Sequence, residues 1–141
     1  MARGATVWLT GLPAAGKTTI GDAVAEGLDE RGYAIVSLIS PYRSARDQAR
    51  ELHARAELPF LEVYLDTPLA ECERRDPRGL YAPARRGEIT GFTGVDDPYE
   101  PPLAPEVVID TSRLSIQECV DAIVNKLLAL GYILPHGHIA E

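Results

Sequence analysis

The sequence reads WLTGLPAAGKTTIG from Trp8 to Gly21. Its inner part, GLPAAGKT (Gly11–Thr18), fits the pattern G-x-x-x-x-G-K-[ST] at every fixed position. The apolar run Ala5–Gly11 predicts a buried strand before the pattern, and apolar residues at helical spacing predict a helix from Lys17 to Arg31 after it. A glycine-rich turn from strand to helix is the setting that this pattern requires, so the sequence predicts a site for a nucleoside triphosphate.

Each fixed position of this loop has a physical task. Gly11 and Gly16 permit backbone angles that aim successive N–H groups into one concavity, and the following helix adds its positive N-terminal end. The Lys17 ammonium would reach the β- and γ-phosphates, and the Thr18 hydroxyl would bind Mg²⁺. The loop therefore predicts both the ligand and its metal ion.

Strand and helix patterns alternate along the rest of the chain. Continuous apolar runs predict three further strands, YAIVSLIS (33–40), PFLEVYLD (59–66) and EVVID (106–110). Helices are predicted at 44–57, after Thr67 as a cap with Pro68 at the first helical position, and after the capping box Ser115–Glu118. This alternation predicts an α/β fold: a P-loop NTPase-type parallel sheet of about four strands with helices on both faces.

Two of the predicted helices have patterned faces. In the 44–57 helix one face carries alanine and leucine and the other carries arginines; the apolar members are Ala45, Ala49, Leu52 and Ala56. The last helix has a longer apolar stripe: Ile116, Cys119, Val120, Ile123, Leu127 and Leu130. Residues 76–105 show no period, and a loop of that length inside a domain is usually functional or mobile.

Composition limits the class of protein. The 141 residues predict one domain over 1–141, with a frayed tail from 133 in which His136 and His138 bind no metal. A net charge of −7 argues against a nucleic-acid partner, and no apolar run approaches the roughly 20 residues of a membrane span. The two distant cysteines, Cys72 and Cys119, are expected to be reduced core residues of a cytoplasmic protein.

An arginine cluster stands out against this acidic background. Its members are Arg74, Arg75, Arg78, Arg85 and Arg86. Such a cluster suits a small anionic ligand, and it equally suits a solvated face; charge alone leaves both readings open.

With the phosphate loop placed, nearly the whole chain resembles the adenylylsulfate kinases (APS kinases). The resemblance lies in ISPYR (Ile39–Arg43), in DTPLAECERRDPRGLYAPARRGEITGFTGVDDPYEPP (Asp66–Pro102), and in the closing VVIDTS and SIQECV. It implies transfer of the ATP γ-phosphate to the 3′-hydroxyl of adenosine 5′-phosphosulfate (APS), which gives PAPS in sulfate assimilation.

The resemblance also implies roles for individual residues. ATP would be bound by Gly11, Leu12, Pro13, Ala14, Ala15, Gly16, Lys17, Thr18, Thr19, Arg74 and Thr111, with Mg²⁺ on Thr18 and catalytic roles for Lys17 and Ser40. The substrate would be bound by Ile39, Ser40, Arg78, Gly91 and Phe92. Phe92 would stack on the substrate adenine; without the resemblance it is better explained as a loop anchor.

One departure from the family pattern affects both fold and function. Members carry a strand, an acidic LDGD-like motif and a substrate-clamp segment between the first helix and ISPYR, whereas here ERGYAIV runs straight into that strand and could belong to either side of the junction. The lost strand lies at the sheet edge in this family, so we expect four adjacent strands and a bare apolar edge at Ala34–Ile39.

The expected consequences are lower stability, pairing of two copies as a homodimer, or a stretch that the recorded sequence has lost. Loss of the acidic motif would remove the group that accepts the substrate proton, which leaves an impaired nucleotide-binding remnant as an alternative to an active kinase. A different small-molecule kinase is a further alternative. Asp66, at the end of the 59–66 run, is a weak candidate for a replacement acid.

Overall fold

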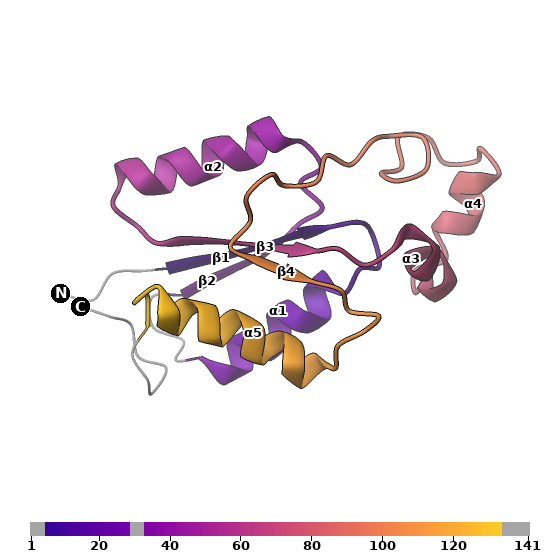
Figure 1. Ribbon diagram of the computed structural model, residues 1–141. Helices are drawn as coiled ribbons and strands as arrows, with labels where there is room; N and C mark the ends of the chain where they lie inside the picture. The colour runs from indigo at the N-terminus through magenta and orange to yellow at the C-terminus, as the bar shows by residue number, and fades with distance from the viewer. Residues whose placement is uncertain (1–4, 29–32, 134–141) are drawn as a thin grey trace.

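The computed structural model describes residues 5–28 and 33–133 (Figure 1). Four strands form one sheet in the order β2-β1-β3-β4, and every neighbouring pair is parallel. The elements in chain order are β1 (Ala5–Gly11), α1 (Lys17–Gly27), β2 (Tyr33–Ser37), α2 (Arg43–Arg55), β3 (Phe60–Leu65), α3 (Leu69–Arg75), α4 (Tyr81–Arg85), β4 (Val107–Ile109) and α5 (Ile116–Ala129). The predicted α/β fold with four parallel strands is confirmed.

Helices cover both faces of the sheet. Figure 1 shows α1 and α5 side by side below the strands and α2 above them, with α3 and α4 beyond the ends toward which the strands run. The lower layer is the apolar core, because side chains of the sheet and of these two helices are fully buried there: Val7, Leu9, Val24, Leu61, Val63, Ile123 and Leu127. Burial on this scale is the main favourable term that holds the layers together.

The upper helix meets the sheet through polar side chains. The α2 residues that face the strands are Arg46, Arg50 and His53; Arg46 is only 1% exposed. On the apolar flank, by contrast, Leu52 is 64% exposed. The helical pattern of 44–57 is confirmed, and its arginine-bearing face is the one that packs, because β3 supplies the buried carboxylate of Glu62 and the half-buried Glu106 lies just before β4.

Four local predictions need correction. The first helix ends at Gly27, before the predicted Arg31. Thr67 is not a helix cap: its hydroxyl bonds Thr111 and the Ala15 carbonyl, and Pro68 is itself the N-cap of α3, so it does not occupy the first helical position. The long loop also contains the short helix α4.

The predicted capping box and most of the predicted apolar stripe of the C-terminal helix α5 are confirmed. Its capping box is present, since the Ser115 hydroxyl accepts from the Glu118 amide and the Glu118 carboxylate accepts from the Ser115 amide. The middle of its stripe is buried, but both end positions face solvent, Ile116 at 52% and Leu130 at 40% exposure. Ile133 is buried, so the tail is held at least to that residue; His136 and His138 lie outside the described residues.

Strand β2 is an edge strand, as predicted. Within residues 5–28 and 33–133 no strand pairs with its outer side, and Leu38, just past its end, is 54% exposed. Both cysteines are free and buried, as expected for reduced core residues. No helix among the described residues is long and apolar enough to cross a membrane.

Candidate active site

The phosphate loop joins the end of β1 to the start of α1. Its turn uses left-handed backbone angles at Ala14 (φ 68°) and Gly16 (φ 107°), the second of which favours glycine. Gly11 lies against β3, where a side chain would meet the Leu65 carbonyl at 2.9 Å. Both glycines of the pattern are therefore required by the backbone itself.

The loop lysine points back into its own loop. Lys17 Nζ donates to the carbonyls of Gly11 (3.0 Å) and Leu12 (2.6 Å), and burial lowers its pKa to about 8. Thr18 and Thr19 begin the helix with exposed side chains. The cation and a free hydroxyl thus lie where a triphosphate and its metal ion would be bound.

A polar cluster supports the loop from behind. Thr111 Oγ1 donates to the Ala15 carbonyl (2.6 Å) and lies 2.7 Å from Thr67 Oγ1. Arg75 Nη1 donates to Thr111 Oγ1 (2.9 Å) and to the Ala14 carbonyl (3.3 Å). These contacts tie the Ala14 and Ala15 carbonyls to the side chains of Arg75 and Thr111 and so fix the shape of the loop.

The turn after β2 forms a second side of the site. Ser40 has a positive φ of 40°, its Oγ accepts from Trp8 Nε1 (3.1 Å) and donates to Thr10 Oγ1 (3.2 Å). Thr10 Oγ1 in turn donates to the Ile39 carbonyl (2.6 Å). The Ser40 turn is therefore held directly against the last residues of β1 before the phosphate loop.

The loop with Gly91 and Phe92 forms the third side. The Asp96 carboxylate accepts from both of their amides (2.6 and 2.7 Å), and these bonds lower the pKa of Asp96. The Phe92 ring packs edge-on against Tyr81 at 4.8 Å. Phe92 is thus a loop anchor in this structure.

Contacts to the phosphate loop locate this third side. The Tyr81 hydroxyl donates to the Pro13 carbonyl (2.7 Å), so the residue that supports Phe92 also touches the loop. A side chain at Gly94 would lie 3.0 Å from Leu12 Cδ2. The phosphate loop, the Ser40 turn and the Phe92 loop therefore gather at one end of the sheet.

Two predicted arginines lie on the surface. Arg74 pairs with Glu71, and Arg78 is exposed beside Gly79. It is Arg75 that reaches the phosphate loop. Sequence reasoning missed Thr67, Tyr81 and Asp96 as supports. Thr67 and Tyr81 bond backbone groups far away in the sequence, whereas Asp96 closes a local turn by accepting from the amides of Gly91 and Phe92; neither kind of contact leaves a periodic signal.

An acidic residue follows β3 at this end of the sheet. Asp66 follows Leu65, which pairs with Gly11, and its side chain is exposed. The described residues contain no group of three or more His, Cys, Asp or Glu side chains able to hold a metal ion. Thr18, with phosphate oxygens as further ligands, is the residue whose exposed hydroxyl suits Mg²⁺.

Comparison with known proteins identifies the family. The family model described as adenylylsulphate kinase matches residues 3–36 and 33–110. The chain belongs to the adenylylsulfate kinase family. An adenylyl-sulfate kinase of Picosynechococcus is 38% identical over 178 residues, covering 94% of this chain and 98% of the relative. The Saccharomyces cerevisiae adenylyl-sulfate kinase is 37% identical over 178 residues, covering 94% and 88%.

A solved adenylylsulfate kinase supports the same membership. The structure of the Mycobacterium tuberculosis APS kinase CysC with AMPPNP and APS is 35% identical, with a TM-score of 0.79 over 91% of this chain and 99% of that one. The resemblance seen in the sequence is thereby confirmed, and with it the assignment to the ATP-dependent kinases.

The comparisons also bear on the missing segment. The alignment spans 178 residues but covers 94% of this chain, which is about 133 of its 141 residues, so about 45 positions of the adenylyl-sulfate kinase relative have no counterpart here (178 less about 133). The two matches to the family model overlap at residues 33–36. Strand β2 thus fits the family pattern on both sides of the junction, which agrees with the ambiguity predicted for ERGYAIV.

Proposed function

We propose that residues 1–141 form one kinase domain that transfers the γ-phosphate of ATP to the 3′-hydroxyl of APS. The observation that carries this proposal is the gathering of the phosphate loop, the Ser40 turn and the Phe92 loop at one end of the sheet. Family membership supports the reaction, and the cytoplasm is the compartment that suits two free, buried cysteines.

The residues divide the work between the two nucleotides. Backbone N–H groups of the loop from Gly11 to Thr19, with Pro13 excepted, would bind the triphosphate, and the Lys17 ammonium would place its charge against the transferred phosphoryl group. Mg²⁺, held by the Thr18 hydroxyl, would neutralise phosphate charge. Ile39, Ser40, Arg78, Gly91 and Phe92 would bind APS, while Arg74 and Thr111 would lie toward ATP.

Transfer itself needs alignment more than covalent help from the protein. The γ-phosphorus bond to the β-bridging oxygen of ATP breaks as a bond to the 3′-oxygen forms, and the hydroxyl proton leaves to a base or to water. A phosphorylated Ser40 is not required, and its hydroxyl is already bonded to Trp8 and Thr10.

The test is a coupled assay with APS and MgATP on the folded protein. We expect PAPS formation that Lys17→Met abolishes and that Phe92→Ala weakens through the KM for APS. Folded wild-type protein that makes no PAPS above background would refute the kinase proposal. Unchanged APS affinity in Phe92→Ala would favour a different small-molecule substrate.

The missing segment favours a second candidate, a protein that binds ATP without transferring phosphate. About 45 positions of a related kinase have no counterpart here, and removal of a general base costs roughly 10²–10⁴ in rate. Calorimetry would then show ATP binding with no turnover. Asp66→Asn tests whether the exposed carboxylate after β3 has taken over the role of the missing general base. Loss of residual turnover at unchanged ATP affinity would assign it that role.

We also infer that the protein is a homodimer formed through the outer edges of β2. The run Tyr33–Ile39 has no charged residue, and two identical edges can pair antiparallel about a two-fold axis. Ala34 is exposed on this strand, so Ala34→Lys should convert dimer to monomer in light scattering. Leu103→Lys, at an exposed site outside β2, should leave the dimer intact; a wild-type monomer would exclude the pairing.

A further inference from the structure

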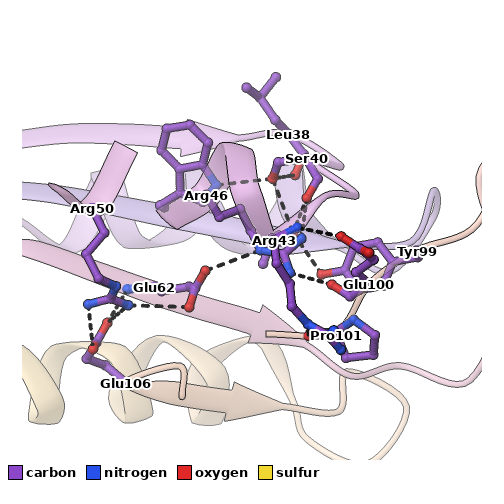
Figure 2. Close-up of polar contacts among 12 residues, drawn as sticks. Leu38, Ser40, Arg43, Arg46, Arg50, Glu62, Tyr99, Glu100, Pro101 and Glu106 are labelled. Atoms are coloured by element: carbon purple, nitrogen blue, oxygen red, sulfur yellow. Dashed lines mark hydrogen bonds and ion pairs between the residues drawn. The ribbon is translucent and has the colours of Figure 1, made fainter. Parts of the chain in front are cut away.

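Two segments that we assign to the APS side are distant in sequence but joined in space. The Ser40 turn lies just after the end of β2, and the stretch Tyr99–Pro101 lies farther along the loop that carries Phe92. Figure 2 shows both segments converging on one side chain of α2, Arg46. The inference below rests on the proposed function and deepens it.

Arg46 has a fork of donors that spans the two segments. Nη1 donates to the Ser40 carbonyl and Nη2 donates to the Glu100 carbonyl. The guanidinium also lies over the Tyr99 ring, 5.5 Å from its centre. With 1% exposure, this cation is among the most completely buried side chains of the described residues.

Further bonds join the same two segments. The Arg43 amide donates to Glu100 Oε1 (2.8 Å), Arg43 Nε donates to the Pro101 carbonyl (2.7 Å), and the Glu100 amide donates to the Pro41 carbonyl (2.8 Å). The Tyr99 hydroxyl lies 2.8 Å from Thr10 Oγ1. The two segments therefore behave as one bonded unit beside the phosphate loop.

The guanidinium is itself held in place from the sheet. Arg46 Nε lies 3.4 Å from Glu62 Oε2 on β3, and the other oxygen of Glu62 pairs with Arg50 at 3.3 Å. Arg50 also binds both oxygens of Glu106 at 2.9 Å (Figure 2). Glu62 thus balances the charge of Arg46 through an ion pair that includes no hydrogen bond to Nε, while Arg50 completes the charge balance away from the Ser40 turn.

Arginine is specific for this task. A lysine keeps the charge but carries all its donors on one nitrogen, so it cannot reach the Ser40 carbonyl, the Glu100 carbonyl and Glu62 from three separate nitrogens as the guanidinium does. Ser40 is also held at a positive φ, which a non-glycine residue keeps only when its surroundings impose it. The bond from Arg46 to the Ser40 carbonyl is one such constraint.

We propose that Arg46 is a positioning residue for the sulfated nucleotide: its fork locks the Ser40 turn to the Glu100 segment and so fixes the two sides of the APS site relative to each other. It acts through these segments and does not touch ATP. Loss of the fork should therefore weaken APS and leave ATP unaffected.

The test compares Arg46→Lys with Arg50→Lys on the full chain. Arg46→Lys should raise the KM or Kd for APS about tenfold, since hydrogen bonds to charged groups are strong, with the ATP constant within twofold of wild type. Arg50→Lys perturbs the same charge network but neither segment, so it should lower thermal stability and leave both constants unchanged. A purely structural Arg46 would give the same result as Arg50.

The outcomes separate this inference from the proposed function. Wild-type protein that binds no APS refutes the proposed function; APS binding that is equal in wild type and Arg46→Lys refutes the inference. If Arg46→Lys does not fold, amide exchange in the wild type decides. The amides of Arg43, Arg46 and Glu100 should then open together and be slowed together by APS, and independent opening would overturn the proposal.

Discussion

The hydroxyl of Thr111 offers a sharp test of how the phosphate loop is held. Thr111→Val keeps the shape of the side chain but removes the donor to the Ala15 carbonyl (2.6 Å) and the acceptor for Arg75 (2.9 Å). The side chain also loses its contact with Thr67 Oγ1 (2.7 Å), but each partner keeps one bond, because Thr67 Oγ1 still reaches the Ala15 carbonyl (3.3 Å) and Arg75 still reaches the Ala14 carbonyl (3.3 Å). We therefore expect a loss of about 2 kcal/mol in the free energy of unfolding, within the range for partly unsatisfied buried groups.

Part of that loss should appear in ATP binding. If about half of it is spent in reordering the loop, the Kd for ATP rises roughly fivefold. The melting temperature should fall by about 7 °C for a chain of this length. Denaturant unfolding measures the loss in the free energy of unfolding, and calorimetry measures the Kd for ATP.

The matched control is Thr111→Ser, which keeps the hydroxyl and loses the methyl group near Gly16. It should cost about 1 kcal/mol of stability and leave ATP affinity unchanged. The reasoning is refuted if valine and serine weaken ATP equally, or if valine is as stable as the wild type.

Two further predictions concern the same loop and its helix. Burial lowers the pKa of Lys17 to about 8, and a bound triphosphate favours the charged form of this side chain. The affinity for ATP should therefore be constant below pH 8 and fall above it. Calorimetry in two buffers should detect the proton that the protein takes up when ATP binds. A flat affinity from pH 7 to 9.5 would contradict this. Gly21→Ala should lower the stability of the protein in thermal unfolding by about 1–3 kcal/mol, because the new Cβ would meet Ser37 Oγ at 2.6 Å and Leu9 Cδ1 at 3.1 Å. Helix propensity alone would make alanine stabilising at this position, so a stabilised variant would show that the contact between α1 and β2 is loose.

The sequence was most informative where structure depends on neighbours in the chain. The phosphate loop, the parallel strands and the Ser115 capping box were all predictable, because each uses residues within one strand, one turn or one helix end. The sheet edge at β2 could be predicted once the gap in the family pattern was seen.

The sequence was least informative where a distant partner decides the outcome. The arginine face of α2 packs on the sheet because Glu62 and Glu106, from other elements, neutralise it. Thr67 is a residue type that often caps helices, yet its hydroxyl donates to the Ala15 carbonyl of the phosphate loop. No periodicity in α2 or around Thr67 reports such pairings, so tertiary contacts override the local preference.

Strand order has a consequence for how this fold tolerates deletion. The nucleotide-gripping turn follows β1, which has β2 on one side and β3 on the other. Removal of material outside β2 truncates the periphery and spares the centre, whereas excision of β1 or β3 would split the molecule. Deletions outside β2 are therefore tolerated better than deletions in the centre of the sheet, and ATP binding should be the last property that successive deletions remove.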